Sequence, residues 1–270
     1  MRHDSIGRTS PVGAARALVM PLLAIISLTP VLMLTMTALG AAGRYPQLWA
    51  SVGEDSVLAA LLHSRPLWTA FVTSVLLALC TGVCATVLAF VSARALSRAT
   101  ERVRRIGSAA SFLPVIAPPI ALGVGVQVLA IRANLGGSWL GVLAAHVIPA
   151  TGYLTLFLSA VLATYDVAME DAARSLGATS WTVFRRVTLP SLRGALTQCV
   201  ALGALVSWGQ LALTLVVSGG VVRSLPVELL AFVQSGDDRL GAAAALLLTV
   251  PPVLVLGVSQ AGARRTGAIA

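Results

Sequence analysis

The chain has 270 residues, of which 57% are hydrophobic and only 11% are charged, and its mean hydropathy is +0.89. Soluble domains are typically about 45–50% apolar, so this composition excludes an ordinary soluble fold. The formal net charge is +9, and all 19 basic residues are arginines because the sequence contains no lysine. A charge of this size can indicate nucleic-acid binding, but its position along the chain decides its meaning.

Six segments are long and apolar enough to cross a bilayer as helices, which takes about 20 residues. In chain order they are residues 17–39, 67–91, 109–131, 139–163, 192–217 and 240–258. None contains an acidic residue, as expected where burying a charge in lipid is costly. We therefore predict an all-α integral membrane protein: a single transmembrane domain over residues 17–258, with tails at residues 1–16 and 259–270.

Arginines mark the orientation of the predicted spans. With the N-terminus inside, fourteen of the 19 arginines lie in inner segments and five in outer ones. Short cytoplasmic loops carry such a positive excess. This pattern predicts a multi-pass membrane protein with both termini cytoplasmic. The basic charge then faces the lipid bilayer, and we expect no nucleic-acid partner.

Prolines interrupt the third predicted span. Pro114, Pro118 and Pro119 each lack an amide donor, so they free backbone carbonyls that lipid cannot satisfy. Neighbouring helices or a water-lined path must then bind those carbonyls. Ordinary kinking and a role in a moving path both remain open at this point.

The cytoplasmic loop of residues 166–190, between the fourth and fifth spans, predicts two short helices. Asp166 is a candidate N-cap, and Gly177 is a natural helix stop because glycine adopts the left-handed conformation. Ser180 is expected to cap the second helix, and Pro190 to close it before the fifth span. An interfacial amphipathic helix lying on lipid headgroups is the alternative reading of this loop.

The spacing of residues in this loop resembles the EAA loop of binding-protein-dependent ABC-type import permeases. That family pattern is Glu-Ala-Ala, three residues, Gly, nine residues, Ile, one residue and Leu-Pro. The matching positions here are Asp171-Ala172-Ala173, Gly177, Val187 and Leu189-Pro190. Asp171 stands where glutamate is usual, although Glu170 precedes it, and Val187 replaces isoleucine. The likeness covers about three quarters of the chain and is closest to the polyamine, iron, thiamine and sulfate-like branch.

The resemblance implies the type I ABC importer permease fold, with six transmembrane helices and a coupling helix between helices 4 and 5. In that family the coupling helix docks on a separate ATPase subunit, which binds ATP and Mg. The implied partners are a second permease subunit in a homo- or heterodimer, two ATPase copies and an extracytoplasmic solute-binding protein. The coupling residues it implies are Glu170, Asp171, Ala172, Ala173, Gly177, Leu189 and Pro190.

This chain is predicted to be a non-catalytic subunit without a cofactor of its own. A phosphate-binding loop needs a lysine after its glycines, and the sequence has none. ATP hydrolysis by that route therefore belongs to another chain. Coupling is expected to be confined to the loop of residues 166–190, so Arg98→Ala in the other cytoplasmic loop should leave transport largely unaffected.

Polar residues within the spans are candidates for the translocation path: Gln127, His146, Trp208 and Gln210. Each could instead tie helices together by hydrogen bonds, which are common between membrane helices. Polyamine members of the family tend to carry acids near the position of Gly209–Gln210. This chain has none there, so the sequence assigns no substrate.

Two other functional classes fit the sequence less well. A secondary transporter would normally place ionisable residues at the bilayer midplane, where only His146 qualifies. Another kind of polytopic membrane protein is a further alternative. An intramembrane enzyme would need paired carboxylates, a Ser/His dyad or a metal-binding cluster, and the three histidines are scattered.

An outer segment after the fifth span also predicts a short helix. Ser224 can cap it, Pro226 suits its first turn and Gly236 can end it. We expect this helix to contribute to the docking surface for the solute-binding protein.

Overall fold

The computed structural model describes residues 63–267 together with positions 19, 21, 22, 25, 26, 28–30 and 32–36. Most of the predicted first span, residues 17–39, lies outside the described residues. The chain divides into two compact units, residues 65–231 with 247–270 and residues 1–64 with 232–246. Helices α3 to α10 belong entirely to the larger unit, while α11 and α12 each contribute to both.

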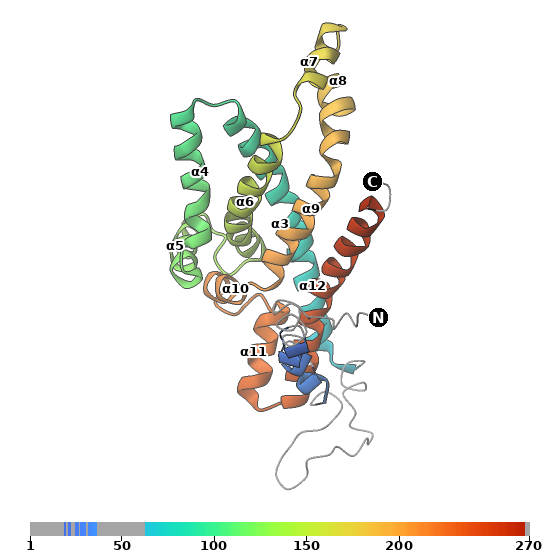
Figure 1. Ribbon diagram of the computed structural model, residues 1–270. Helices are drawn as coiled ribbons and strands as arrows, with labels where there is room; N and C mark the ends of the chain where they lie inside the picture. The colour runs from blue at the N-terminus through green and yellow to red at the C-terminus, as the bar shows by residue number, and fades with distance from the viewer. Residues whose placement is uncertain are drawn as a thin grey trace, which may run out of the picture. The chain divides into compact units, whose positions relative to one another are not determined.

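The regular elements of the described residues are all helices (Figure 1). In order they are α3 (Arg65–Ser97), α4 (Glu101–Ile116), α5 (Pro119–Arg132), α6 (Trp139–Ala163), α7 (Ala168–Ser175), α8 (Ser180–Val183), the π-helix η1 (Phe184–Thr188), α9 (Leu189–Trp208), α10 (Leu211–Ser218), α11 (Leu225–Ser235) and α12 (Asp238–Gly267). Four stretches of this part are long and apolar enough to span a membrane, or five if α4 and α5 form one bent span. The count of six spans therefore stays a prediction.

Helices α3, α6 and α9 pack against one another and form the centre of the larger unit. One hydrophobic core joins small side chains of α3 to leucines of α6 and to Cys199 of α9. At Gly82 of α3, an added Cβ would come within 2.5 Å of the Val200 carbonyl oxygen, and at Gly203 of α9 it would lie 3.1 Å from Gly82 Cα. Without a side chain at either position, the backbones of α3 and α9 approach each other directly, as small residues permit in membrane bundles.

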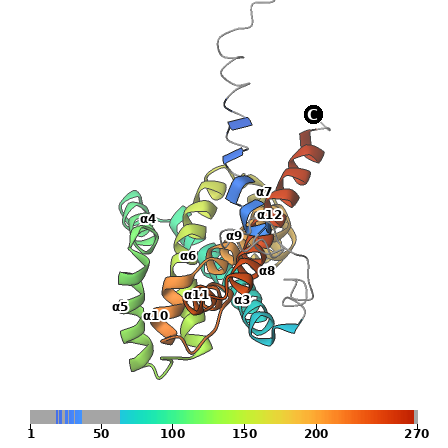
Figure 2. The ribbon, with the colours of Figure 1, turned by 90° about the horizontal axis from the view of Figure 1, so that it is seen from below.

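The third span breaks more sharply than a kink, because α4 and α5 meet at an angle of 104°. Ala117 and Pro118 between them have extended ψ angles of 136° and 129°. Each of these residues precedes a proline, whose ring disfavours the helical conformation of the residue before it. Helix α4 then packs on α6, and α5 lies beside α10 (Figure 2). The predicted interruption is confirmed, and its cause is the Pro118-Pro119 pair.

The fifth span differs from the prediction at both ends. Pro190 does not close a short helix, because the chain is continuously helical from Ser180 to Trp208 and Pro190 sits in the first turn of α9. Proline is tolerated there because the preceding turn is a π-helix, whose wider turn leaves room for its ring. The other end breaks at Gly209 and Gln210, after which α10 begins as a separate helix.

The helix predicted after the fifth span is confirmed as α11. It begins at Leu225, directly after Ser224, and carries Pro226 in its first turn. Gly236 follows its last residue with a φ of +75°, the left-handed conformation of a helix stop.

Candidate functional site

Helices α7 and α8 form the loop that the sequence singles out, and Figure 1 shows them at the opposite end of α9 from α10. The Asp166 carboxylate accepts a hydrogen bond from the Ala168 amide at 2.9 Å, which satisfies a donor at the start of α7. Gly177 has a φ of +84° and ends this short helix, as predicted. The cap of α8 is Thr179 rather than Ser180, because the Thr179 hydroxyl accepts from the Thr182 amide.

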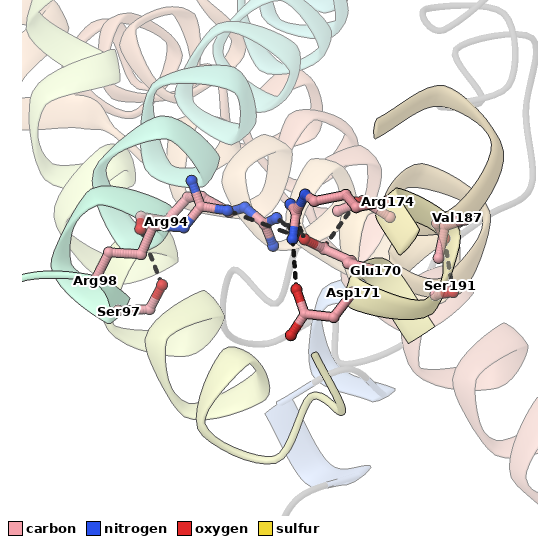
Figure 3. A network of polar contacts seen from close by, with 9 residues as sticks. Arg94, Ser97, Arg98, Glu170, Asp171, Arg174, Val187 and Ser191 are labelled. Atoms are coloured by element: carbon pink, nitrogen blue, oxygen red, sulfur yellow. Dashed lines mark hydrogen bonds and ion pairs between the residues drawn. The ribbon is translucent and has the colours of Figure 1, made fainter. Parts of the chain in front are cut away.

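The centre of the loop is the carboxylate of Glu170, whose side chain is 0% exposed. One guanidinium nitrogen of Arg94, in the last turn of α3, donates to both carboxylate oxygens, at 2.7 and 2.6 Å. The Thr188 hydroxyl of η1 donates to Oε1 at 2.8 Å, and Arg174 of α7 donates to Oε2 at 3.1 Å. Figure 3 shows the Arg94 and Arg174 side chains converging on this one group.

The electrostatics of Glu170 follow from these contacts. Burial by itself would raise the pKa of this carboxyl, because it penalises the charged form. The hydrogen bonds from Arg94 and Thr188, together with the Arg94 charge, outweigh burial and lower the pKa to about 2. Glu170 is therefore ionised at neutral pH, and its charge is matched by neighbouring arginines.

Asp171, the next residue, has the opposite environment. Its side chain is 67% exposed, and an ion pair joins it at 2.7 Å to Arg174 of the same helix. Adjacent positions on a helix point in different directions, so α7 turns Glu170 inward and Asp171 outward. Asp171 is thus available to a partner protein, whereas Glu170 is not.

Large apolar side chains are exposed around the turn between α7 and α8. Leu176 is 89% exposed and Trp181 is 66% exposed, and Met169 of α7 is also exposed. Trp181 stacks at a tilt on Phe184, with ring centroids 5.6 Å apart, and Phe184 in turn contacts Phe90 of α3. The turn at Gly177 therefore presents apolar side chains outward, backed by an aromatic row that leads to α3.

The other predicted coupling residues lie on the same loop and at the start of α9. Ala172 is exposed and Ala173 is half-buried on α7. Leu189 and Pro190 are exposed in the first turn of α9. The structure brings Glu170, Asp171, Ala172 and Ala173 together on α7. It places Leu189 and Pro190 at the start of α9, beyond α8 and η1.

Sequence reasoning missed the residues that hold Glu170 in place. The sequence pattern placed Arg94 and Arg98 on the cytoplasmic side without linking them to Glu170, and it assigned Thr188 no role. Arg98 also lies near this group, 3.9 Å from Glu170 Oε2. That Arg98→Ala leaves transport largely unaffected stays a prediction. The sequence did contain one signal for this contact. Arg94 and Arg98 follow the second span four residues apart, so they share one helix face that could bind an acid of the loop.

His146 of α6 is buried, not exposed to an open path. Its Nδ1 lies 2.8 Å from the Ser207 hydroxyl of α9, and its Nε2 lies 2.9 Å from the Thr214 hydroxyl of α10. The Thr214 hydroxyl already donates to the Gln210 carbonyl, so it must accept from His146. This assigns the proton to Nε2 and leaves Nδ1 to accept from Ser207. A neutral imidazole therefore joins the two halves of the broken fifth span.

Trp208, also predicted for the path, is buried and donates its indole N–H to the Leu248 carbonyl of α12 at 2.9 Å. That carbonyl has no helical donor because Pro252, four residues later, has no amide hydrogen. Trp208 thus supplies the bond that the proline removes. Gln127 of α5 and Gln210 remain half-buried, so these two are the better candidates for a polar path.

Within the residues that the structure describes, His, Cys, Asp and Glu side chains form no group of three or more that could hold a metal ion.

Comparison with known proteins relates these features to a family. The model of the family described as binding-protein-dependent transport system inner membrane component matches residues 82–265. This match includes the whole loop, the break of the third span and the break of the fifth.

Individual relatives agree with the family match. The molybdenum transport system permease protein ModB of Mycobacterium bovis is 31% identical over 229 residues, covering 79% of this chain and 83% of that protein. PhnV of Salmonella typhimurium, a permease protein assigned to 2-aminoethylphosphonate transport, is 28% identical over 203 residues, covering 74% of this chain and 76% of that one.

Among solved structures, a chain of a bacterial ABC transporter involved in the import of the polysaccharide alginate has the same fold. The TM-score is 0.73 over 94% of this chain and 98% of that chain, at 17% sequence identity.

Proposed function

Because the chain belongs to the family of binding-protein-dependent transport system inner membrane components, we propose that its loop of residues 166–190 is where this permease meets a separate ATPase. The protein is a permease subunit of an ABC importer in the inner membrane. Through this loop, ATP hydrolysis by the ATPase would move the spans of the permease.

The exposed apolar turn is the single observation that carries this proposal. Leu176 is 89% exposed at the end of α7, beside the left-handed Gly177 and close in sequence to the exposed Trp181. A group of large exposed apolar side chains rimmed by polar residues is typical of an interaction site. The ends of α7 and α8 therefore fit a groove on another protein better than free solvent.

The charges around this turn indicate the character of that groove. Asp171 is exposed but already paired with Arg174, and Arg185 and Arg186 of η1 are exposed. We propose an apolar cleft with a polar rim that carries both signs of charge. Leu176 and Trp181 would supply most of the contact, and Asp171 would fix its orientation.

The remaining partners follow from the same premise. We propose that the loop and both termini face the cytoplasm, where two ATPase copies bind ATP and Mg. A second permease subunit would complete the translocation path, and an extracytoplasmic solute-binding protein would deliver the solute. The relatives are named for molybdenum and for 2-aminoethylphosphonate, which differ in chemistry. Solute choice is therefore assigned to the binding protein rather than to acids in the spans.

The test is retention of the ATPase by the native complex, purified through a tag on this chain. Leu176→Glu and Asp171→Lys should each lose most of the ATPase, since one places a charge in an apolar cleft and the other reverses a surface charge. Both positions are exposed, so insertion and folding should be unaffected.

Gly177 gives a matched pair of variants. An added Cβ would meet nothing within 4 Å, so any cost comes from the backbone conformation alone. Asparagine tolerates positive φ whereas valine does not. Gly177→Asn should keep the ATPase, and Gly177→Val should lose it. Wild-type retention in both Leu176→Glu and Gly177→Val would refute the assignment.

A further inference from the structure

Glu170 lies behind the exposed turn and joins three separate elements. It belongs to α7, receives Arg94 from the end of α3, and receives Thr188 from η1, which continues directly into α9. Among the exposed residues, Trp181 reaches α3 only through Phe184, by aromatic contact. Glu170 instead joins the loop to α3 and to η1 directly, through one buried carboxylate.

We propose that Glu170 fastens the loop to α3 and α9, so that a displacement of α7 by the ATPase moves α3 and α9 together as one body. This inference rests on the proposed function, in which the ATPase docks on the loop. It assigns to Glu170 a positioning role, distinct from the surface role of Asp171 beside it.

The two fastened helices are already joined along their length. Gly82 of α3 and Gly203 of α9 bring the backbones into contact, and no Cβ fits between them at Gly82. Their common core includes Ala85, Ala89 and Cys199. Contacts this close resist sliding, so a pull on either helix is transmitted to both.

Helix α4 is held differently. It packs mainly on α6 and less extensively on α3. Its ion pairs join Glu101 to Arg104 and Arg105 within the same exposed turn. These pairs lie within α4, so they do not join α4 to the loop of residues 166–190. A displacement of α7 should therefore leave α4 behind while α3 and α9 follow.

The chemistry of the fastening depends on the carboxylate. Oε1 accepts from Arg94 and Thr188, and Oε2 accepts from Arg94 and Arg174, so both oxygens are used. Glutamine has the same shape, but its amide nitrogen would face donors and has nothing to donate to. Glu170→Gln should therefore release the contact without leaving a hole.

Distances between spin labels test the inference in the purified complex, without nucleotide and after trapping with ATP and vanadate. Labels attach through cysteines introduced at exposed positions of α7, α3 and α4, which are Ser175, Ala95 and Val103. The three native cysteines are replaced by serine. Trapping should leave the Ser175–Ala95 distance unchanged and shift the Ser175–Val103 distance.

Glu170→Gln should keep the ATPase bound, because the exposed turn is intact, yet its Ser175–Ala95 distance should now shift on trapping. Thr188→Val, which keeps the Arg94 pair and the side-chain volume, should instead shift the distance from Ser175 to a label at Arg193 on α9. The matched control is Arg104→Met, which removes an exposed arginine and should change neither distance.

The outcomes separate the two proposals. If Leu176→Glu and Gly177→Val both keep the ATPase, the proposed docking function fails, whatever the distances show. If the docking variants behave as expected but Glu170→Gln keeps the Ser175–Ala95 distance fixed, the fastening role is wrong. It is equally wrong if trapping in the unmutated permease shifts both label pairs, or neither.

Discussion

Two buried polar clusters tie helices together in this permease, and they use different chemistry. At the loop, the ionised Glu170 is surrounded by arginines and a hydroxyl at the ends of the helices. At the break of the fifth span, neutral His146 bridges Ser207 and Thr214. The first cluster lies outside the predicted spans, where water can reach the arginine side chains, and the second lies within a span.

The comparison shows how the surroundings decide the kind of bond. A charge deep in lipid is expensive, so hydroxyls and a neutral ring hold the span break together. Near the membrane surface, where water reaches the arginines, an ion pair loses less solvation than it would in lipid. Removal of one partner then leaves the other buried and uncompensated. The two clusters should therefore respond to mutation on different scales, which the following experiments measure.

The largest effect is expected for Glu170→Leu. Removing the acid leaves the mostly buried Arg94 without this ion-pair partner. Loss of one partner from a buried pair typically lowers the free energy of unfolding by about 3–5 kcal/mol. Unfolding of the purified permease in detergent should report this loss of stability. Glu101→Leu, which breaks a fully exposed pair in α4, should change stability by about 1 kcal/mol or less. Equal effects of the two variants would erase the distinction between the buried cluster and a surface pair.

Ionisation of Glu170 should also make the stability of the permease depend on pH, with a smaller effect. The pKa of Glu170 is about 2 in the folded protein against 4.5 for an unperturbed glutamate, so the unfolded chain takes up the proton first. Its contribution is fully present above pH 4.5 and is lost as pH falls toward 2. Glu170→Gln should flatten the decline in unfolding temperature across that window. A variant curve parallel to that of the unmutated chain would contradict the assignment.

His146→Leu tests the neutral cluster and should cost about 2 kcal/mol, since two hydrogen bonds within the membrane are lost at about 1 kcal/mol each. Ser207→Ala removes one of the two bonds and should cost about half as much. Unfolding in detergent micelles measures both. A cost for His146→Leu as large as that for Glu170→Leu would mean that the span break is held by more than these hydrogen bonds.

The smallest effect is expected for Trp208→Phe, at about 1 kcal/mol, because it removes one bond to the Leu248 carbonyl. Pro252→Ala restores an amide hydrogen that can reach the same carbonyl within α12. Trp208→Phe should therefore cost less in the Pro252→Ala background, and a double-mutant cycle gives the difference. If the costs of the two mutations simply add, the amide at position 252 and the Trp208 indole do not compete for this carbonyl.

The sequence predicted the elements of the loop because their signals are local. Gly177 stops α7 through its own backbone preference, and the acidic start of α7 needs only the residues of one turn. The same holds for α11, whose Ser224, Pro226 and Gly236 lie within one short segment. Even Pro118 and Pro119 indicated the break in the third span, although not its angle of 104°.

The partners of these elements were beyond the sequence because they depend on long-range packing. Glu170 and Arg94 are 76 positions apart, and His146 and Thr214 are 68 apart. Nothing local distinguishes Glu170 from Asp171, since only the packing of α7 against α3 decides which acid is buried. Pro190 misled the prediction because a proline ends a helix or begins one, and the π-turn before it settles the choice.

The π-helix also has a meaning in terms of chain length. A π-turn amounts to an α-helix with one residue inserted, and each residue turns an α-helix by about 100°. Deleting one residue from positions 184–186 would close the turn to the ordinary pattern and rotate Thr188 away from Glu170. In an alignment this change would be a single gap, with every side chain of the motif still present. The nine-residue interval between Gly177 and Val187 therefore sets the orientation of Thr188. A loop one residue shorter would keep the motif residues but would lose the contact between Thr188 and Glu170.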